Sequence, residues 1–148
     1  MIFHLRPVSE QDLQQIKHIN DLVQSIPWSL NEILSEFDQN NPYSLCATGG
    51  DGKILGYLFI RNVGSDLEIT TLCVAPSAQR QGVAKGLLKE IIKTKPPGAG
   101  ILLEVSEKNA PAVSLYKALG FQIQGIRQHY YRDDSNALLM KLDLAKPQ

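Results

Sequence analysis

Apolar residues recur at steps of three or four in three segments of the chain, and this spacing predicts amphipathic helices. The first helical segment follows Ser9 and extends to Ile26. Ser29 and Glu32 have the spacing of a capping box, in which each side chain satisfies a free backbone N–H group. A short second helix is therefore expected, ending at Phe37. The two later helical segments are residues 83–92 and 112–119.

Short alternating or continuous apolar runs predict strands between and after these helices. Two of them are joined by Gly49-Gly50-Asp51-Gly52, whose glycines suit a tight turn. The run at residues 101–105 is almost wholly apolar, which is typical of a strand buried on both faces. The predicted strands are residues 2–6, 43–48, 54–63, 67–75, 101–105, 122–131 and 137–144. The resulting order, β-α-α-β-β-β-α-β-α-β-β, predicts a mixed α/β sheet with helices on its faces.

The composition excludes several classes of protein. The chain has 148 residues, of which 43% are hydrophobic and 20% charged, and this length predicts one domain over residues 1–148. Fifteen basic and fifteen acidic residues balance, which argues against a nucleic-acid partner, since such proteins usually present a basic field. No apolar run is long enough to span a bilayer, and the start does not resemble a signal peptide. We therefore expect a soluble, cytoplasmic protein with no membrane partner.

The most informative segment, residues 74–86, passes from a strand through a polar turn into a helix. Several backbone N–H groups at a helix N-terminus lack intrahelical partners and point outward with the positive end of the dipole, so a phosphate binds there well. Gly82 and Ala84 are small enough to let an anion approach, and Lys85 is near enough to meet its charge. The spacing is neither that of a Walker loop nor that of the dinucleotide motif. The alternative is a helix start that is rich in small residues and binds nothing.

Two motifs resemble those of the GNAT superfamily of N-acetyltransferases. Gln79-x-x-Gly82-x-Ala84 after an apolar strand is similar to the Arg/Gln-x-x-Gly-x-Gly/Ala motif of that superfamily, and residues 103–121 are similar to its second hallmark. Ala84 stands where a second glycine is common and is within the family's pattern. The predicted order of elements matches that fold over essentially the whole chain. The resemblance implies a mixed, mostly antiparallel, seven-stranded twisted sheet flanked by about four helices.

The resemblance also implies acetyl-CoA as co-substrate, without a metal. The strand backbone at Leu72, Cys73 and Val74 would pair with the pantetheine arm, and Asn109 would also contact the cofactor. The amides that would hold the pyrophosphate belong to Arg80, Gln81, Gly82, Val83, Ala84 and Lys85.

Transfer of an acetyl group to an amine requires a proton acceptor for the amine, a donor for the oxyanion and a proton for the departing thiolate. Glu104 lies in the apolar run, where burial would make a carboxylate a stronger base, although a solvent-facing strand glutamate fits the spacing equally well. Tyr116 by helical spacing alone is a core residue. The resemblance favours Glu104 as the base, directly or through a water, and Tyr116 as the acid that protonates the sulfur of CoA. The backbone N–H of Val74 is the expected oxyanion donor.

A narrower resemblance is to the bacterial ribosomal-protein-alanine N-acetyltransferases. The segments that carry it are residues 26–29, residues 103–105 with Asn109 and Tyr116, and residues 128–131. It implies that the acceptor is the N-terminal amino group of a protein, in particular a ribosomal alanine. The side chains expected at the acceptor site are Trp28, Tyr130 and Tyr131. Because neighbouring strand residues point to opposite faces, at most one of the two tyrosines is expected to line the site. The compact turn at residues 132–136 differs from the hairpin of these enzymes. Because that hairpin borders the acceptor site in the family, the identity of the acceptor stays open.

Several alternatives remain open from the sequence. The nearest is the same chemistry on a lysine side chain or a small-molecule amine, and a more distant one is a non-catalytic acyl-CoA-binding module. Glu68 lies on the strand where some relatives carry their base, and Cys73 lies beside the cofactor path, where an acetyl-cysteine route can be drawn. Cys46 and Cys73 have no metal or redox spacing and are expected to be buried thiols. We expect a monomer or a weak dimer.

Overall fold

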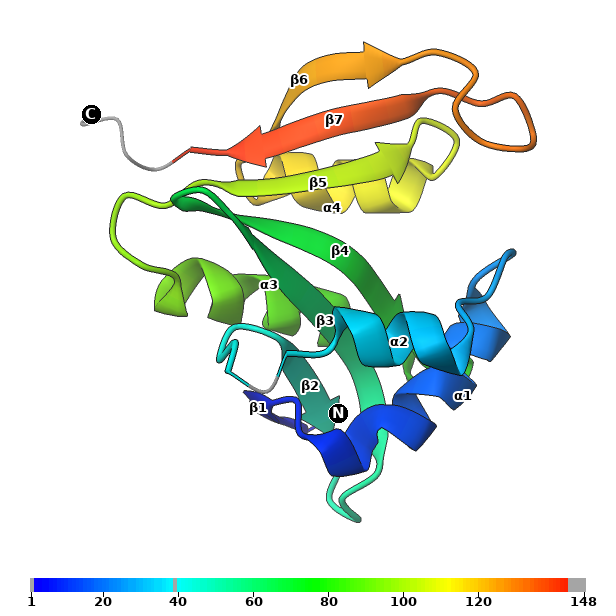
Figure 1. Ribbon diagram of the computed structural model, residues 1–148, viewed down its shortest axis with the longest axis vertical. Helices are drawn as coiled ribbons and strands as arrows, with labels where there is room; N and C mark the ends of the chain where they lie inside the picture. The colour runs from blue at the N-terminus through cyan, green and yellow to red at the C-terminus, as the bar shows by residue number, and fades with distance from the viewer. Residues whose placement is uncertain (1, 39, 144–148) are drawn as a thin grey trace. The chain divides into compact units, whose positions relative to one another are not determined.

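The computed structural model describes residues 2–38 and 40–143, and its elements follow the predicted order. The strands are β1 (His4–Pro7), β2 (Leu45–Thr48), β3 (Ile54–Val63), β4 (Asp66–Val74), β5 (Ile101–Ser106), β6 (Gln122–Arg127) and β7 (Ala137–Leu142). The helices are α1 (Leu13–Val23), α2 (Leu30–Glu36), α3 (Val83–Thr94) and α4 (Ala110–Ala118), with short 3-10 helices at Glu10–Asp12 and Pro76–Ala78. The strands of this part of the chain form one sheet in the order β1-β2-β3-β4-β5-β7-β6 (Figure 1). The predicted mixed α/β fold with seven strands and four helices is confirmed.

The chain divides into two compact units. The first contains Met1–Arg61 and Thr71–Thr94, and the second contains Asn62–Thr70 and Lys95–Gln148. Strand β4 contributes its first residues to the second unit and its last residues to the first. The expectation of a single domain over residues 1–148 stays a prediction.

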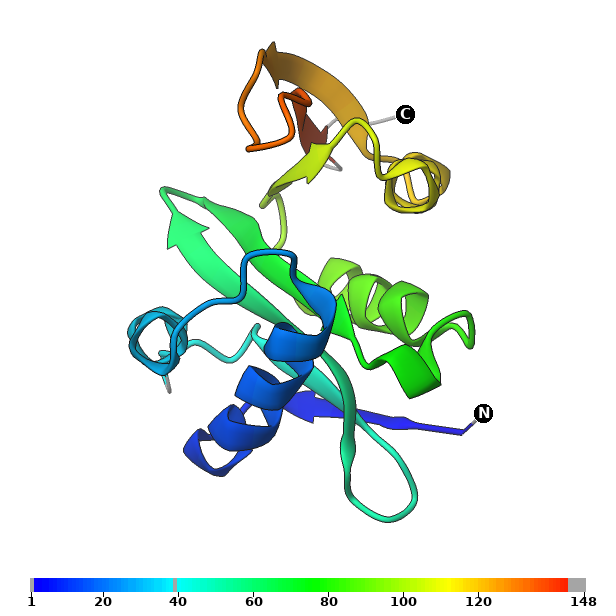
Figure 2. The ribbon, with the colours of Figure 1, turned by 90° about the vertical axis from the view of Figure 1, so that its right-hand side faces the viewer.

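The first unit is a layered structure. Helices α1 and α2 cover one face of its strands and α3 covers the other (Figure 2). Strand β2 pairs antiparallel with β1 and with β3. The apolar stripe of α1, with Ile16 and Ile19, belongs to a buried cluster that includes Ile33 of α2 and Tyr57 of β3. Each such side chain contributes about 1.5–3 kcal/mol on burial, so this cluster attaches both helices to the sheet.

Helix α2 begins at the predicted capping box. The Ser29 hydroxyl accepts a hydrogen bond from the Glu32 N–H at 3.0 Å, and the Glu32 carboxylate accepts one from the Ser29 N–H at 2.9 Å. The helix ends at Glu36, with Phe37 as its C-cap. The predicted cap and helix are confirmed.

Helix α1 is shorter than predicted and ends at Val23. Gln24 has extended backbone, and its N–H still bonds the Asn20 carbonyl at 2.9 Å. The Asn20 side chain then accepts a hydrogen bond from the Trp28 N–H at 2.7 Å, which redirects the chain toward α2. Ile26 fits the helical periodicity, yet it lies beyond the helix and is exposed.

The second unit contains β5, β6, β7, the beginning of β4 and helix α4. Strand β5 pairs antiparallel with β7 along its length and parallel with β4 at Leu67 and Glu68. Its burial alternates, so the expected strand buried on both faces is wrong: one face is buried and the other is half-buried. After α4, Gly120 has a φ of 103°, and its N–H bonds the Lys117 carbonyl at 3.0 Å. A left-handed residue at this position ends the helix and returns the chain to β6.

Strand β6 ends at Arg127, short of the predicted boundary at Tyr131. His129 has a φ of 53°, which interrupts the extended backbone, and its N–H bonds the Asn136 side-chain oxygen at 3.0 Å. Tyr130 and Tyr131 therefore lie in a loop rather than in a strand. Strand β7 ends at Leu142, and the predicted last residue, Leu144, lies outside the described residues.

Candidate functional site

The turn between β4 and α3, in the first unit, contains two residues with left-handed backbone. Arg80 has a φ of 64° and Gly82 a φ of 86°. A Cβ at Gly82 would meet no atom within 4 Å, so backbone conformation rather than lack of space favours glycine there. Arg80 adopts the same region with a side chain, at a cost of about 1–2 kcal/mol. Such strained backbone is typical of ligand-binding segments.

The amides of this turn are available to a ligand. Among the described residues, no hydrogen-bond acceptor is recorded for the N–H groups of Arg80, Gln81 and Gly82. The Gly86 N–H bonds the Gly82 carbonyl at 2.9 Å, so residues 83–85 form the first turn of α3, whose N–H groups have no carbonyl one turn earlier. These are the six amides that the sequence predicts for the pyrophosphate. Successive N–H groups around a left-handed residue can form a concave anion site.

Gln79, the first residue of the motif, shapes this turn. Its side-chain amide donates a hydrogen bond to the Val74 carbonyl at 3.1 Å. The Gln81 side chain likewise donates to the Ser77 carbonyl at 3.3 Å. The first bond attaches the turn to the end of β4 and the second attaches it to the 3-10 helix at Pro76–Ala78, a structural role that the sequence did not indicate.

The predicted pantetheine strand alternates between a buried and a half-buried face. Cys73 is only 2% exposed and belongs to the apolar cluster of the first unit, whereas Leu72 and Val74 are half-buried. The expectation of buried thiols is confirmed for both cysteines. The Cys73 thiol accepts a hydrogen bond from the Gln24 side chain at 3.2 Å. On the neighbouring strand, a Cβ at Gly56 would lie 3.0 Å from the Cys73 carbonyl oxygen, so glycine permits the close approach of β3 and β4.

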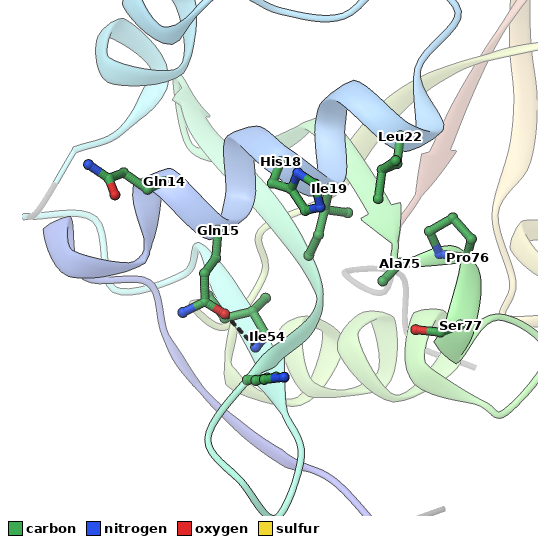
Figure 3. Close-up of a pocket in the computed structure, with 10 residues that line it drawn as sticks. Gln14, Gln15, His18, Ile19, Leu22, Ile54, Ala75, Pro76 and Ser77 are labelled. Atoms are coloured by element: carbon green, nitrogen blue, oxygen red, sulfur yellow. Dashed lines mark hydrogen bonds between the residues drawn. The ribbon is translucent and has the colours of Figure 1, made fainter.

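A cavity of about 640 Å³ lies beside α1, within the first unit (Figure 3). It is lined by Gln14, Gln15, His18, Ile19, Leu22, Lys53, Ile54, Ala75, Pro76 and Ser77. The Gln15 side-chain oxygen accepts a hydrogen bond from the Ile54 N–H at 3.1 Å, which links α1 to the start of β3. None of the residues predicted for the site lines this cavity. Its lining comes from three separate segments of the chain, so no motif of consecutive residues could have predicted it.

A buried polar network connects α1, β3 and β4 in the first unit. The Asn20 side-chain amide donates a hydrogen bond to the Tyr57 hydroxyl at 2.9 Å. Burial raises the pKa of Tyr57 well above its usual range, and Cys73 beside it adds to the shift. Thr71 lies 3.7 Å from the Cys73 sulfur. Trp28, predicted for the acceptor site, is bonded to Asn20 through its backbone and is half-buried against the apolar cluster.

In the second unit, Glu104 lies on β5 opposite Leu139 of β7. Its side chain is 27% exposed, and its carboxylate lies 3.4 Å from the guanidinium of Arg127. The sequence left open a buried and a solvent-facing carboxylate, and the structure gives Glu104 an intermediate position on the half-buried face of the strand. The residue instead combines partial solvent access with a cationic neighbour from β6.

Tyr130 and Tyr131 lie together beside this ion pair. Their ring centroids are 5.1 Å apart with the planes at 83°, and the Arg127 guanidinium lies 5.6 Å from the centre of the Tyr130 ring. The expectation that the two tyrosines point to opposite faces is wrong, because they are in a loop and not in a strand. Burial raises the pKa of Tyr131, and the negative charge of Glu104 raises it further.

The loop that carries these tyrosines is tied to the end of β5. The Glu107 carboxylate accepts hydrogen bonds from the Asn136 N–H at 3.3 Å and from its side-chain amide at 3.2 Å. Hydrogen bonds from the hydroxyl and the N–H of Ser135 lower the pKa of Asp133. These contacts give the compact turn at residues 132–136 a defined conformation.

Tyr116 and Asn109 belong to helix α4 of the same unit. Tyr116 is buried, and its ring packs edge-on against Phe121 with 5.6 Å between centroids. Asn109 is the N-cap, and its side-chain oxygen accepts a hydrogen bond from the Ala112 N–H at 3.3 Å. Asn109 is exposed, and its side-chain oxygen caps the helix.

The predicted residues therefore form two groups. The first unit holds the amides of the turn, the end of β4 and Trp28, and the second holds Glu104, Tyr116, Asn109 and the two tyrosines. Sequence reasoning missed Arg127 and Asn20, whose partners lie far along the chain. The described residues contain no group of three or more histidine, cysteine, aspartate or glutamate side chains arranged for a metal ion. No helix among them has the length and apolar content needed to cross a membrane.

Comparison with known proteins matches residues 13–121 to the acetyltransferase (GNAT) family. The [ribosomal protein bS18]-alanine N-acetyltransferase of Escherichia coli K12 is 31% identical over 141 residues, covering 90% of this chain and 93% of the relative. The N-alpha-acetyltransferase RimI of Mycobacterium tuberculosis is 31% identical over 126 residues, covering 82% of this chain and 78% of that protein.

Solved structures are also similar to this chain over nearly its whole length. The crystal structure of the ribosomal-protein-S18-alanine N-acetyltransferase from Escherichia coli superposes with a TM-score of 0.91 at 28% identity, covering 99% of this chain and 97% of the other. Ard1 from Thermoplasma volcanium has a TM-score of 0.89 at 21% identity, covering 99% and 100%. At 21% identity, the similarity to Ard1 shows a shared fold and nothing further.

Proposed function

Because the chain belongs to the GNAT family of acetyltransferases, we propose that it transfers the acetyl group of acetyl-CoA to the N-terminal α-amino group of a protein. It is an acyltransferase, and the N-terminal alanine of a ribosomal protein is the first candidate acceptor. The similar enzymes of Escherichia coli and Mycobacterium tuberculosis, named for alanine and α-amino acetylation, support this choice. With such an acceptor, the protein works in the cytoplasm.

The observation that carries the proposal is the turn before α3. It offers free amides around two left-handed residues, Arg80 and Gly82, at the positive end of a helix. That arrangement suits a pyrophosphate, the most highly charged linker in CoA. In the proposal, residues 80–85 bind this linker, and the backbone of residues 72–74 pairs with the pantetheine arm. Asn109 supplies a further contact through its side-chain NH2 group.

The chemistry needs three proton transfers. An α-amino group has a pKa of about 8 and is mostly charged at neutral pH, so Glu104 takes a proton from it, directly or through a water. The amine then forms a bond to the acetyl carbon and releases its second proton to solvent water, and the N–H of Val74 donates to the oxyanion. When the carbon–sulfur bond breaks, the Tyr116 hydroxyl supplies a proton to the thiolate. This direct attack requires both substrates to be bound at once.

Peptide acetylation tests the proposal. A peptide with the N-terminal sequence of ribosomal protein bS18 is incubated with acetyl-CoA, and the modified position is located by mass spectrometry. We expect one acetyl group on the α-amine, release of an equal amount of CoA thiol, and no reaction when the N-terminus is blocked. Equal modification of a blocked, lysine-containing peptide would contradict N-terminal acetylation. Binding of acetyl-CoA without thiol release from any amine would contradict the enzyme assignment.

A further inference from the structure

Asn20 occupies an unusual position at the end of α1. Asn20 is 0% exposed, and its buried polar groups have hydrogen-bond partners. Its carbonyl bonds the Gln24 N–H, its side-chain oxygen bonds the Trp28 N–H, and its side-chain amide bonds the Tyr57 hydroxyl, at 2.9, 2.7 and 2.9 Å. A single buried residue thus connects α1 and β3 with the segment of residues 24–28.

That segment is attached at both ends. The Gln24 side chain donates to the Cys73 sulfur at 3.2 Å, and Trp28 is held by Asn20 immediately before the capping box of α2. Between these attachments, Ile26 is 52% exposed. The segment therefore presents an apolar side chain from a backbone whose conformation is set before any partner binds. A preformed segment loses less conformational entropy when it binds.

We infer that Asn20 is a positioning residue for recognition of the protein acceptor. It holds residues 24–28 in the conformation in which Ile26 and Trp28 contact the acceptor peptide. Without its side-chain oxygen, the Trp28 N–H loses its acceptor, and a partly buried donor without a partner favours rearrangement. The inference rests on the proposed function and deepens it, because it concerns the acceptor and not acetyl-CoA.

The test compares two variants that both lose the bond between residues 20 and 57. Asn20→Leu also removes the acceptor of the Trp28 N–H, whereas Tyr57→Phe leaves that bond in place. For Asn20→Leu we expect the KM for the acceptor peptide to rise about tenfold, with kcat and the KM for acetyl-CoA within about twofold of wild type. For Tyr57→Phe all three constants stay within about twofold, although its thermal stability falls.

Fluorescence gives a second readout that does not depend on turnover. Trp28 is the only tryptophan of the chain, so its emission reports the environment of this segment alone. In Asn20→Leu we expect emission at longer wavelength, as the ring becomes more exposed, and in Tyr57→Phe the wild-type spectrum. Ile26→Ser, which leaves the segment attached, should raise the peptide KM without moving the emission.

Several outcomes would overturn the inference. One is a folded Asn20→Leu protein with the wild-type peptide KM and emission. Another is an equal rise in peptide KM in Asn20→Leu and Tyr57→Phe, since the effect would then come from core packing. If Asn20→Leu does not fold, Asn20→Ser replaces it with the same expectations. If no peptide N-terminus is acetylated but another amine is, the proposed function fails, while the emission of the two variants still decides whether Asn20 positions the segment.

Discussion

Two carboxylates, one in each unit, have opposite environments. The Asp12 side chain is 6% exposed, and it accepts two hydrogen bonds from Arg6, at 2.7 and 2.8 Å, and two from Ser9, at 2.7 and 3.1 Å. Glu104 is more exposed, and the contact recorded for its carboxylate in the described part of the chain is a single ion pair with Arg127 at 3.4 Å.

The difference lies in the remaining capacity to accept a proton. A carboxylate has about four lone-pair sites, and Asp12 accepts four hydrogen bonds from fixed donors, three at Oδ2 and one at Oδ1. Proton transfer to Asp12 would therefore break local structure. Most lone-pair sites of the Glu104 carboxylate have no fixed donor in the described part of the chain. Because the side chain is partly exposed, a water molecule can reach them. Partial exposure and lone pairs without fixed donors are therefore the features that make Glu104, rather than Asp12, the candidate base.

The largest effect that this comparison predicts is on catalysis by Glu104→Gln. Without the base, kcat should fall about 10²–10⁴-fold, as measured by release of CoA thiol. The free energy of unfolding should change by less than about 1 kcal/mol, because the ion pair is partly solvated. Glu10→Gln, at an exposed position outside the candidate site, is the matched control and should keep nearly wild-type kcat. A Glu104→Gln enzyme within a few-fold of wild type would remove Glu104 from the mechanism.

Asp12→Asn should show the opposite behaviour. Loss of charged hydrogen bonds from Arg6 and Ser9 should lower the free energy of unfolding by about 2–3 kcal/mol, as measured by urea denaturation. Below the unfolding transition, kcat should remain close to that of wild type. A large fall in kcat without a loss of stability would erase the contrast between the two carboxylates.

The contribution of Asp12 to stability should depend on pH. Burial alone would raise the pKa of Asp12, but the hydrogen bonds from Arg6 and Ser9 outweigh it and lower the pKa below its ordinary value. The folded state therefore binds its proton less readily than the unfolded state. The stabilisation from Asp12 is complete above the ordinary pKa of about 4 and disappears as pH falls through the lower folded-state value. Wild type should lose this contribution between neutral and strongly acidic pH, and Asp12→Asn should not.

Gly82→Ala extends the comparison from side chains to backbone. Gly52 has nearly the same left-handed φ, 82° against 86°, and equally open surroundings, so Gly52→Ala is a matched control for strain. Both variants should lose about 1–2 kcal/mol of stability. Gly82→Ala alone should weaken acetyl-CoA binding, by about tenfold in calorimetry, because the strain of a left-handed alanine shifts the backbone amides of the turn. Equal affinities in the two variants would contradict the assignment of the pyrophosphate to this turn.

The smallest effect is expected for Arg127→Gln. Its ion pair with Glu104 is half-exposed, so its loss should raise the activation free energy by less than about 1 kcal/mol, which lowers kcat by less than about fivefold. Arg127→Lys should recover most of it. The difference between wild type and Arg127→Gln should shrink at high salt, which screens exposed charges. A loss as large as that of Glu104→Gln would give Arg127 a direct role.

Much of the fold could be predicted because its determinants are local. The capping box of Ser29 and Glu32 and the apolar run at Ile54–Val63 each specify an element without help from distant residues. The ends of α1 and β6 could not be predicted. The first depends on a bond between Asn20 and Trp28, and the second on a bond between His129 and Asn136. Such contacts span turns whose conformations have no periodic pattern.

The candidate site divides in the same way. The turn at Gly82 could be expected from spacing, since a glycine and a helix start are properties of a few consecutive residues. The left-handed backbone of Arg80, the partner of Glu104 and the contact between Tyr130 and Tyr131 could not. Arg127 reaches Glu104 because β6 and β5 both pair with β7. The order of the strands in the sheet cannot be predicted from the sequence of either strand alone.

By itself the sequence determined which segments become helices and strands, where a helix opens on small residues, and which family the motifs resemble. These properties depend on hydrophobic period, capping and glycine, which act within a few residues. Only the tertiary structure decided that Asp12 is held by hydrogen bonds from Arg6 and Ser9, that Glu104 is half-buried beside Arg127, and that Asn20 holds residues 24–28. The physical reason is that hydrogen bonds and ion pairs have short range, so they exist only once folding has brought remote residues within about 3 Å of one another.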